Sequence, residues 1–472
     1  MLLRNGTVGG ERVDLRIVNG LIAEIGSIEG AGIDLGGRYV SPGLWDNHVH
    51  FSQWALNSRR LDVSAATSAA EAASMVANAM DGQPLVGVGF RDGLWADAPT
   101  RDVLDAASGG IPVVLVSGDL HSAWLNSAAL AEHGFADHPT GLLVEDDAFG
   151  VTNSVADVTD AQLDAWCKDA GHRAASRGVV GIVDLEMDWN LDTWQRRMQG
   201  GFDTQRVEFG IYTQHLDRAI AQGLHTGQPF GDLLAVGRYK VITDGSLNTR
   251  TAYCFDEYPG LEGTALAHGM LTVPTDELVP LMRKAVAGGL EPTVHAIGDH
   301  ANTLVLDAFE QIGCTGRLEH AQLLALSDLA RFAALGVTAS VQPEHAMDDR
   351  DVADRYWTGR TDRAFVLRSL LDAGADLAFG SDAPVAPLDP WVTMAAAVGR
   401  ARGGREPWHP EQSVSNAEAM AASVRSTVTV GQPADLVITP IDPLTATAEQ
   451  LRTMPVDATV LAGRFTHNAL GG

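Results

Sequence analysis

The sequence predicts an α/β protein: a TIM-type (β/α)8 barrel, an α/β insertion after its first strand, and a small β-sandwich domain built from both termini. Between about residues 41 and 424, apolar β-rich runs alternate with alanine-rich helical segments, a pattern typical of parallel βα units. These runs number eight, which is what a closed barrel needs. The 472 residues are enough for such a barrel with appended parts.

Each predicted barrel strand is a short apolar run that ends in polar residues. Such runs, bounded by turn residues and separated by helical segments, favour buried parallel strands over solvent-exposed ones. The eight predicted strands are residues 43–51, 178–186, 206–214, 234–245, 290–299, 316–322, 336–345 and 375–385.

The chain ends and one internal segment do not follow this alternation. Residues 1–40 and 425–472 contain short strands and Asn-Gly turns, and neither piece has enough apolar surface to fold alone. We therefore expect them to pair into one small β domain that flanks a barrel spanning residues 41–424. Residues 52–170 contain strands and helices of their own and are predicted to form the insertion, over the mouth of the barrel.

Composition and charge exclude several classes of partner and metal site. The formal net charge of −27, from 33 basic and 60 acidic residues, repels phosphate backbones and anionic lipids, so nucleic acid and membranes are not expected partners. No secretory segment and no run of about eighteen apolar residues is found, so a cytoplasmic location is expected. The three cysteines lie far apart, so any metal would be held by nitrogen and oxygen ligands.

Four histidines lie at the ends of predicted barrel strands. His48 and His50 are two residues apart and therefore share one face of a strand, where two imidazoles can bind one cation. His295 and His320 end two further strands. The alternatives are a hydrogen-bonded polar pair for the first two and satisfied core histidines for the others. Their matched positions on one barrel favour a metal site.

Lys240 and Asp382 complete this set. An ammonium group cannot ligate a cation, so Lys240 either forms a salt bridge, for example to Asp244, or takes up carbon dioxide and bridges two ions as a carbamate. Asp382 follows a Gly-Ser pair and could ligate an ion and act as general base. Its alternative role is a helix N-cap, for which Asp389 is better placed.

The ordered motifs resemble the amidohydrolase superfamily, and within it the amidohydrolase 3 or YtcJ-like group, which includes N-substituted formamide deformylases. The resemblance covers nearly the whole chain, and its motifs are "SPGLWDNHVHF", "GDLHSAWLNSAAL", "TGLLVE", "YKVITDGSLNTRTA", "VHAIGD", "RLEHAQ", "GVTASVQPEH", "GSDAPVAPLDPW" and "ADLVI".

The resemblance implies one or two divalent metal ions, most often zinc. His48 and His50 with Asp382 would hold the more buried ion and His295 with His320 the more exposed one. A carboxylated Lys240 would bridge them, and Asp382 would move the proton. It also implies a small-molecule substrate and is compatible with a homodimer.

Two further motif positions are candidate substrate-binding residues. His121 lies in the insertion and Arg250 follows Lys240, and each could hydrogen-bond a substrate oxygen or carboxylate. The alternatives are loop anchoring for His121 and a salt bridge for Arg250.

The expected function is hydrolysis of a non-peptide C–N bond, such as that of an N-acyl or N-formyl amide, by metal-activated water. The alternatives are hydrolysis of a cyclic amide, ester or lactone, deamination, or a non-catalytic metal-binding regulatory protein with the same fold.

Overall fold

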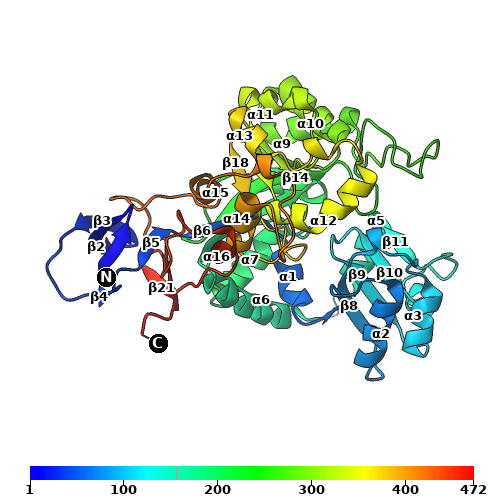
Figure 1. Cartoon of the computed structure of the whole chain (residues 1–472), viewed down its shortest axis with the longest axis horizontal. Helices are drawn as coiled ribbons and strands as arrows, with labels where there is room; N and C mark the ends of the chain where they lie inside the picture. Colours follow the sequence, from blue (N-terminus) through cyan, green and yellow to red (C-terminus); the bar gives the residue numbers. More distant parts are fainter. Residues whose placement is uncertain (156–157, 472) are drawn as a thin grey trace.

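The computed structural model describes residues 1–155 and 158–471. Within them, eight parallel strands form a barrel (Figure 1). In sheet order the strands are β18 (Leu377–Phe379), β17 (Val337–Val341), β16 (Gly316–His320), β15 (Pro292–Ala296), β14 (Leu234–Ile242), β13 (Arg206–Tyr212), β12 (Val179–Asp184) and β6 (Leu44–Val49). Each lies inside one of the eight predicted runs, so the predicted barrel is confirmed.

The barrel closes between its last and first strands, β18 and β6. The backbone N–H of Asp382 donates to the carbonyl of His48 at 2.7 Å, and that of His50 donates to the carbonyl of Ala383 at 2.7 Å. Gly380 allows this approach, because a Cβ there would lie 2.7 Å from the backbone nitrogen of His48. Closure therefore brings Asp382 next to the two histidines of the first strand.

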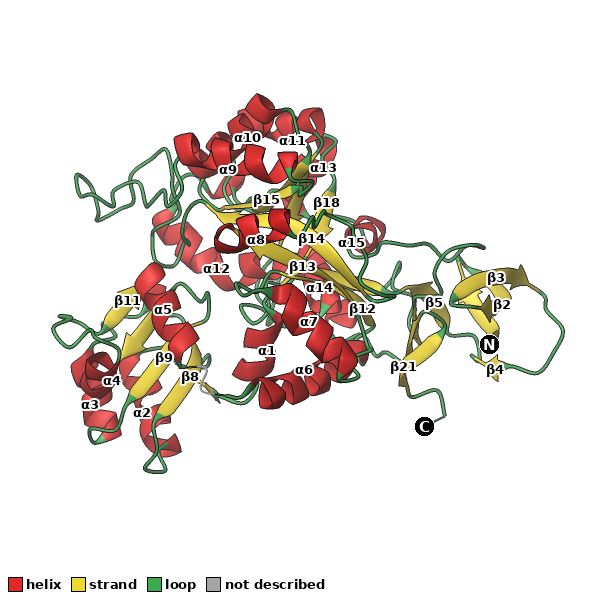
Figure 2. Cartoon of the chain, turned by 180° about the vertical axis from the view of Figure 1, so that it is seen from behind, coloured by secondary structure: helices red, strands yellow, loops and turns green. Residues whose placement is uncertain are grey.

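Helices cover the outside of the barrel, and Figure 2 shows them around the yellow strands. Asp389 caps α14 by accepting from the backbone N–H of Trp391 at 3.1 Å, as expected from the sequence. None of the described helices is long and apolar enough to cross a membrane. The helices that follow barrel strands or link them are α1 (Phe51–Asn57), α6 (Asp160–Ala175), α7 (Asn190–Gln199), α8 (Leu216–Ala221), α9 (Thr275–Ala287), α10 (Asp299–Ile312), α11 (Leu329–Leu335), α12 (Pro343–Tyr356), α13 (Leu367–Asp372), α14 (Pro390–Gly399) and α15 (Asn416–Ala422). Helix α16 (Ala448–Arg452) comes later in the chain, between two strands of the terminal sheet, and packs against α14.

An inserted α/β layer follows the first barrel strand and lies beside the barrel, at the lower right in Figure 1. Its strands are β7 (Leu61–Asp62), β8 (Leu85–Phe90), β9 (Val113–Ser117), β10 (Ser122–Leu125) and β11 (Leu142–Val144), and its helices are α2 (Ala69–Ala79), α3 (Arg101–Ser108), α4 (Ser127–Glu132) and α5 (Asp146–Ser154). Helix α6 begins within the predicted insertion range but packs against α1. The exact domain limits stay predictions.

Both chain termini contribute to a separate sheet, as expected. β5 (Tyr39–Pro42) pairs antiparallel with β19 (Leu436–Thr439), which joins the two ends of the chain. The other strands are β1 (Leu2–Val8), β2 (Glu11–Val18), β3 (Leu21–Gly26), β4 (Ile33–Asp34), β20 (Ala458–Leu461) and β21 (Arg464–Asn468). Neither terminal piece could bury its apolar face without the other.

Candidate functional site

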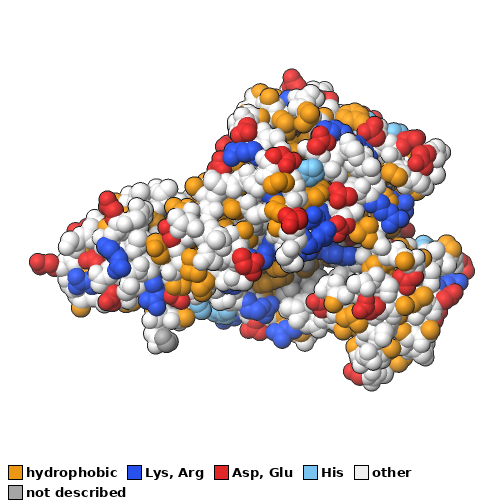
Figure 3. Space-filling model, viewed as in Figure 1, with side chains coloured by type: hydrophobic (Ala, Val, Ile, Leu, Met, Phe, Trp, Pro, Cys, Tyr) orange, Lys and Arg blue, Asp and Glu red, His pale blue; other side chains and the backbone are white. Residues whose placement is uncertain are grey.

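An open cavity of about 930 Å³ lies at the carboxyl ends of the barrel strands. Figure 3 shows the molecule indented between the barrel and the inserted layer, with Lys and Arg side chains gathered around the indentation. All six predicted metal-binding residues line the cavity, and so does His121. The cavity wall also contains apolar side chains: Leu120, Phe149, Met187, Ile242, Leu247, Ile297 and Val385.

Asp382 is the point at which the imidazoles converge. Its Oδ1 lies 3.4 Å from Nε2 of His48 and 3.3 Å from Nε2 of His50. Donor atoms of His48, His320 and Asp382 all lie within 4.8 Å of one another, close enough to share one ion. This group combines His320 with His48 and Asp382, whereas the resemblance assigns His320 to the other ion. The division of ligands between two ions stays a prediction.

The backbone of two site residues is held in the left-handed region. His320 has φ +76° and Asp382 has φ +58°, conformations that are uncommon for residues other than glycine. At His320 this conformation interrupts the alternation of side chains along β16, so that Glu319 and His320 both approach His48. Glu319 is hydrogen-bonded to His48, and the His320 ring lies 4.9 Å from the His48 ring. Such strain is typical of functional sites.

Lys240 is buried within the cluster, with only 1% of its surface exposed. Its Nζ has no hydrogen-bond partner among the described residues. Burial lowers the pKa of this ammonium group, although the carboxylates of Glu319 and Asp382 oppose the shift. A buried amine without a partner is costly as a cation, and a lowered pKa favours the neutral amine.

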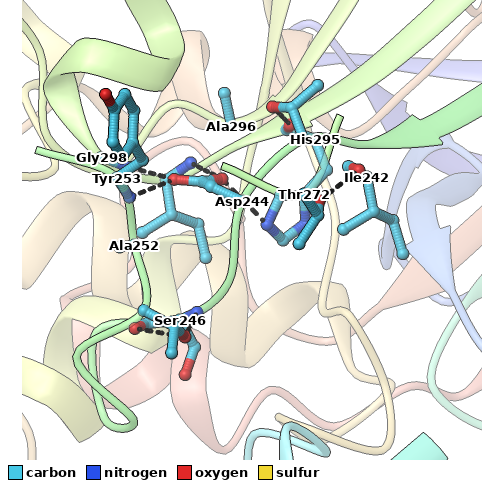
Figure 4. A network of polar contacts seen from close by, with 12 residues as sticks. Ile242, Asp244, Ser246, Ala252, Tyr253, Thr272, His295, Ala296 and Gly298 are labelled. Carbon is cyan, nitrogen blue, oxygen red and sulfur yellow. Dashed lines mark hydrogen bonds and ion pairs between the residues drawn. The ribbon is translucent and has the colours of Figure 1, made fainter. Parts of the chain in front are cut away.

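The predicted alternative for Lys240, a salt bridge to Asp244, is not formed because that carboxylate serves another purpose (Figure 4). Asp244 accepts the backbone N–H groups of Tyr253 at 2.8 Å, Ile297 at 3.0 Å and Gly298 at 2.9 Å. Its Oδ1 also lies 3.4 Å from Nε2 of His295. Asp244 therefore fixes the loop that follows β15 and lies beside the His295 ring.

Glu319 was not predicted from the sequence, yet it is a direct partner of His48. Its Oε2 accepts from His48 Nδ1 at 2.7 Å, and its Oε1 accepts from Thr293 Oγ1 at 2.5 Å. Burial alone would raise the pKa of Glu319, but His48, Lys240 and Arg317 together lower it. A carboxylate on Nδ1 leaves Nε2 of His48 free as a metal ligand and fixes the orientation of the ring.

His121 enters the cavity from the insertion. Its Nδ1 lies 2.8 Å from Oε2 of Glu145, and its ring centroid lies 6.0 Å from that of His295. Burial opposes the charged form of the ring, but the carboxylates of Glu145, Asp119 and Asp382 together raise the pKa of His121 to about 9. A raised pKa favours the protonated ring, in which both nitrogens can donate.

The structure places Arg250 away from the cavity lining. Its guanidinium lies over the ring of Tyr356, 5.3 Å from the centroid. Arg91, from the insertion, lines the cavity instead and pairs with Asp348 at 3.2 Å. Asp349 also lines it, 3.9 Å from Arg91, and burial raises the pKa of this carboxyl to about 7. No sequence motif singled out Arg91 or Asp349.

His345 was also missed. It lies on α12, within the predicted run 336–345, and its Nε2 is 3.9 Å from Oδ2 of Asp382. The amide of Gln322 contacts its Nδ1 at 3.3 Å. The signal was present in the sequence as a histidine at the end of a predicted strand, but the structure places this residue on a helix and not on the strand.

The cluster fits a divalent metal site. Imidazole nitrogens and a carboxylate suit zinc and related ions, and they converge here in a buried position. Several of these polar atoms have no hydrogen-bond partner among the described residues: His50 Nδ1, Lys240 Nζ, His295 Nε2 and His320 Nδ1. Unpaired buried polar atoms are rare in native proteins, and a bound cation would satisfy the imidazole groups.

Known proteins with similar sequences share most of this chain. It is 29% identical to Protein LONG AFTER FAR-RED 3 of Arabidopsis thaliana, over 90% of this chain and 82% of that protein. It is 26% identical to the putative amidohydrolase YtcJ of Bacillus subtilis (94% and 91%) and 25% identical to the N-substituted formamide deformylase of Arthrobacter pascens (93% and 90%).

Solved structures and a family model agree with these relatives. An uncharacterized metal-dependent hydrolase from Pyrococcus horikoshii OT3 superposes with a TM-score of 0.78 at 26% identity, over 95% of this chain and 99% of that one. Residues 31–467 match the amidohydrolase family model Amidohydro_3. The resemblance inferred from the motifs is confirmed. The chain belongs to the amidohydrolase family.

Proposed function

We propose that this protein hydrolyses a non-peptide C–N bond of a small molecule, with an N-acyl or N-formyl amide as the substrate class. The observation that carries the proposal is the buried convergence of His48, His320 and Asp382 at the end of an open cavity. The relative from Arthrobacter pascens, named as an N-substituted formamide deformylase, supports this choice of bond.

We assign the metal to the predicted ligands His48, His50, Lys240, His295, His320 and Asp382, with zinc as the expected ion. Carboxylation of Lys240 would turn a buried amine without a partner into an oxygen ligand for two ions. When bound, a divalent ion lowers the pKa of a water molecule and polarises a carbonyl oxygen. Glu319 holds His48 in the orientation that this requires.

Asp382 is placed to transfer a proton from the attacking water to the leaving amine. It lies among three imidazoles that keep its pKa well below its usual value despite its burial, so it is ionised at neutral pH. An ionised carboxylate can accept the proton of the attacking water and return it to the leaving amine. His121, which lines the cavity from the insertion, can donate a hydrogen bond to a substrate oxygen.

The shape of the cavity favours a small, largely apolar substrate. Phe149, Met187 and Leu247 are among the apolar side chains of its wall, while Arg91 and Asp349 add polar groups to it. Pockets of this kind bind the body of a ligand through apolar contacts and orient it through a few polar groups.

The test compares substrates that carry the same acyl group on either an amide or an ester bond. The holoprotein is assayed with N-formyl and N-acyl amines and with the esters and lactones that carry the same acyl groups, before chelation, after chelation and after zinc is restored. We expect the protein to hydrolyse the amides, and we expect chelation to abolish this turnover and zinc to restore it. The Asp382→Asn variant should not hydrolyse them. Faster turnover of the esters, or turnover that survives chelation, would contradict the proposal.

A further inference from the structure

Glu145 has a backbone conformation that is normally reserved for glycine. It is the N-cap residue of α5, with φ +52° and ψ −126°. A Cβ is sterically disfavoured in this region, so such a conformation persists only where the surroundings enforce it. Glu145 is also buried, with 5% of its surface exposed.

Every polar group of the Glu145 side chain is used. Oε2 accepts from Nδ1 of His121 at 2.8 Å, and Oε1 accepts from Oγ1 of Thr251 at 2.6 Å and of Thr249 at 3.3 Å. The backbone N–H of Glu145 donates to the carbonyl of His121 at 2.9 Å. The carboxylate thus joins the insertion to the loop after β14, the strand that carries Lys240.

A second set of contacts joins the same two segments. Asp119 accepts from the backbone N–H of His121 at 3.2 Å and from Oγ of Ser246 at 2.8 Å. Gly245 leaves room for these contacts between the insertion and the loop, because a Cβ there would meet both Thr251 Oγ1 and Glu145 Oε1. His121, Asp119 and Ser246 line the cavity, whereas Glu145 lies behind His121.

We propose that Glu145 is a positioning residue that holds the His121 ring toward a substrate oxygen and locks the insertion onto the loop of residues 245–251. The statement that His121 contacts a substrate oxygen rests on the proposed function; the link between the insertion and the loop does not. With Nδ1 held by Glu145, Nε2 is the nitrogen left to face the substrate. The carboxylate, and not the fold of α5, explains why a residue with a Cβ occupies a glycine-type conformation.

The test compares four variants of the holoprotein: Glu145→Gln, Glu145→Ala, Glu145→Gly and His121→Asn. Glu132→Ala, at an exposed acidic residue of the insertion, is the control. We expect Glu145→Ala and His121→Asn to raise KM about tenfold with kcat within about threefold, because a binding contact is lost. Glu145→Gln keeps acceptor capacity for the threonines and should raise KM less than Glu145→Ala.

Two readouts do not depend on a substrate. Glu145→Gly should unfold at a higher temperature than Glu145→Ala, because both lack the carboxylate and only glycine relieves the backbone. Amide hydrogens of residues 245–251 should exchange at least tenfold faster in Glu145→Ala than in wild type or Glu132→Ala.

An unchanged KM in Glu145→Ala, or equal unfolding temperatures for the Ala and Gly variants, would overturn the proposal. If the wild type turns over no substrate in the panel, the proposed function fails, and the unfolding and exchange measurements still decide the role of Glu145. Unchanged exchange in Glu145→Ala would then overturn it.

Discussion

The two ends of the same barrel hold different kinds of polar group. At the carboxyl ends, Lys240 Nζ and the free ring nitrogens of His50 and His320 have no hydrogen-bond partner among the described residues. At the amino ends, Arg206 pairs with Asp435 through two contacts of 2.7 and 3.2 Å, and Asp435 also accepts the backbone N–H of Ala462 at 2.7 Å.

Arg425 shows the same pattern at the amino ends. It bonds Glu208 at 2.5 Å and Asn47 at 2.8 Å while its guanidinium covers the ring of Trp45 at 3.7 Å. Satisfied groups stabilise a fold, whereas unsatisfied groups raise its free energy unless something else binds them. Within the described part of the chain, Arg317 Nη1 and Arg238 Nε also lack a partner, so the two ends differ in the kind of group they hold. Imidazoles, an amine and a carboxylate that can hold a metal line the carboxyl ends, whereas arginine–carboxylate pairs such as Arg206–Asp435 join the amino ends to the terminal sheet.

Asp382→Asn should have the largest effect. The carboxamide cannot accept the proton of water and ligates a cation weakly, so kcat/KM should fall by about a thousandfold or more. The metal-free variant should still unfold cooperatively, at a temperature lowered by the loss of the carboxylate contacts to the His48 and His50 rings. Steady-state kinetics and thermal unfolding check this, and a loss below about tenfold would contradict the role of Asp382.

Lys240→Met should reduce kcat/KM by about a hundredfold, since it removes the group that we assign to the metal. In the chelated protein, however, the same change should leave stability unchanged or raise it, because a buried amine without a partner is replaced by an apolar side chain of similar length. Urea unfolding of the chelated protein measures this. A large loss of stability there would show that the amine has a structural partner.

Thr293→Val should have a smaller effect on activity. It removes the hydroxyl that donates to Glu319 at 2.5 Å and so loosens the support of His48. Loss of such a supporting contact typically costs about ten- to a hundredfold in metal affinity or activity, and we expect the lower end because the Glu319–His48 contact itself remains. The readout is the zinc concentration that restores half of the activity after chelation; an unchanged concentration would argue against this support.

Arg206→Ala should affect stability alone. Its partner Asp435 is buried, with 4% of its surface exposed, so the free energy of unfolding should fall by about 1–2 kcal/mol while kcat/KM is unchanged. The control is Arg464→Ala, which removes an exposed pair with Asp203 and should cost less than about 0.5 kcal/mol. A loss of activity in Arg206→Ala would mean that the two ends of the barrel are coupled.

The barrel could be predicted because each strand is a continuous apolar run, and the site residues because polar groups end those runs. His48, His50, Lys240, His295, His320 and Asp382 all line one cavity. Glu319 could not be identified, because it precedes His320 on the same strand and regular alternation would point the two side chains to opposite faces. The left-handed backbone of His320 departs from that alternation.

Residues from the insertion were harder to place. Arg91 and Glu145 are distant in sequence from every barrel strand, and only the packing of the insertion against the loop after β14 brings them to the site. Arg250 lies in a recognisable motif, but its neighbour Tyr356 comes from α12, and the stacking of the two side chains is not visible in the sequence.

Metal content tests the central claim most directly. Elemental mass spectrometry is applied to protein purified without chelator or a metal-binding tag, comparing wild type, Lys240→Ala and Arg206→Ala. The account predicts two equivalents of zinc in the wild type and in Arg206→Ala, and one or fewer in Lys240→Ala. Wild-type protein that retains no metal, and that added zinc or manganese does not make active, would contradict the metal-dependent mechanism.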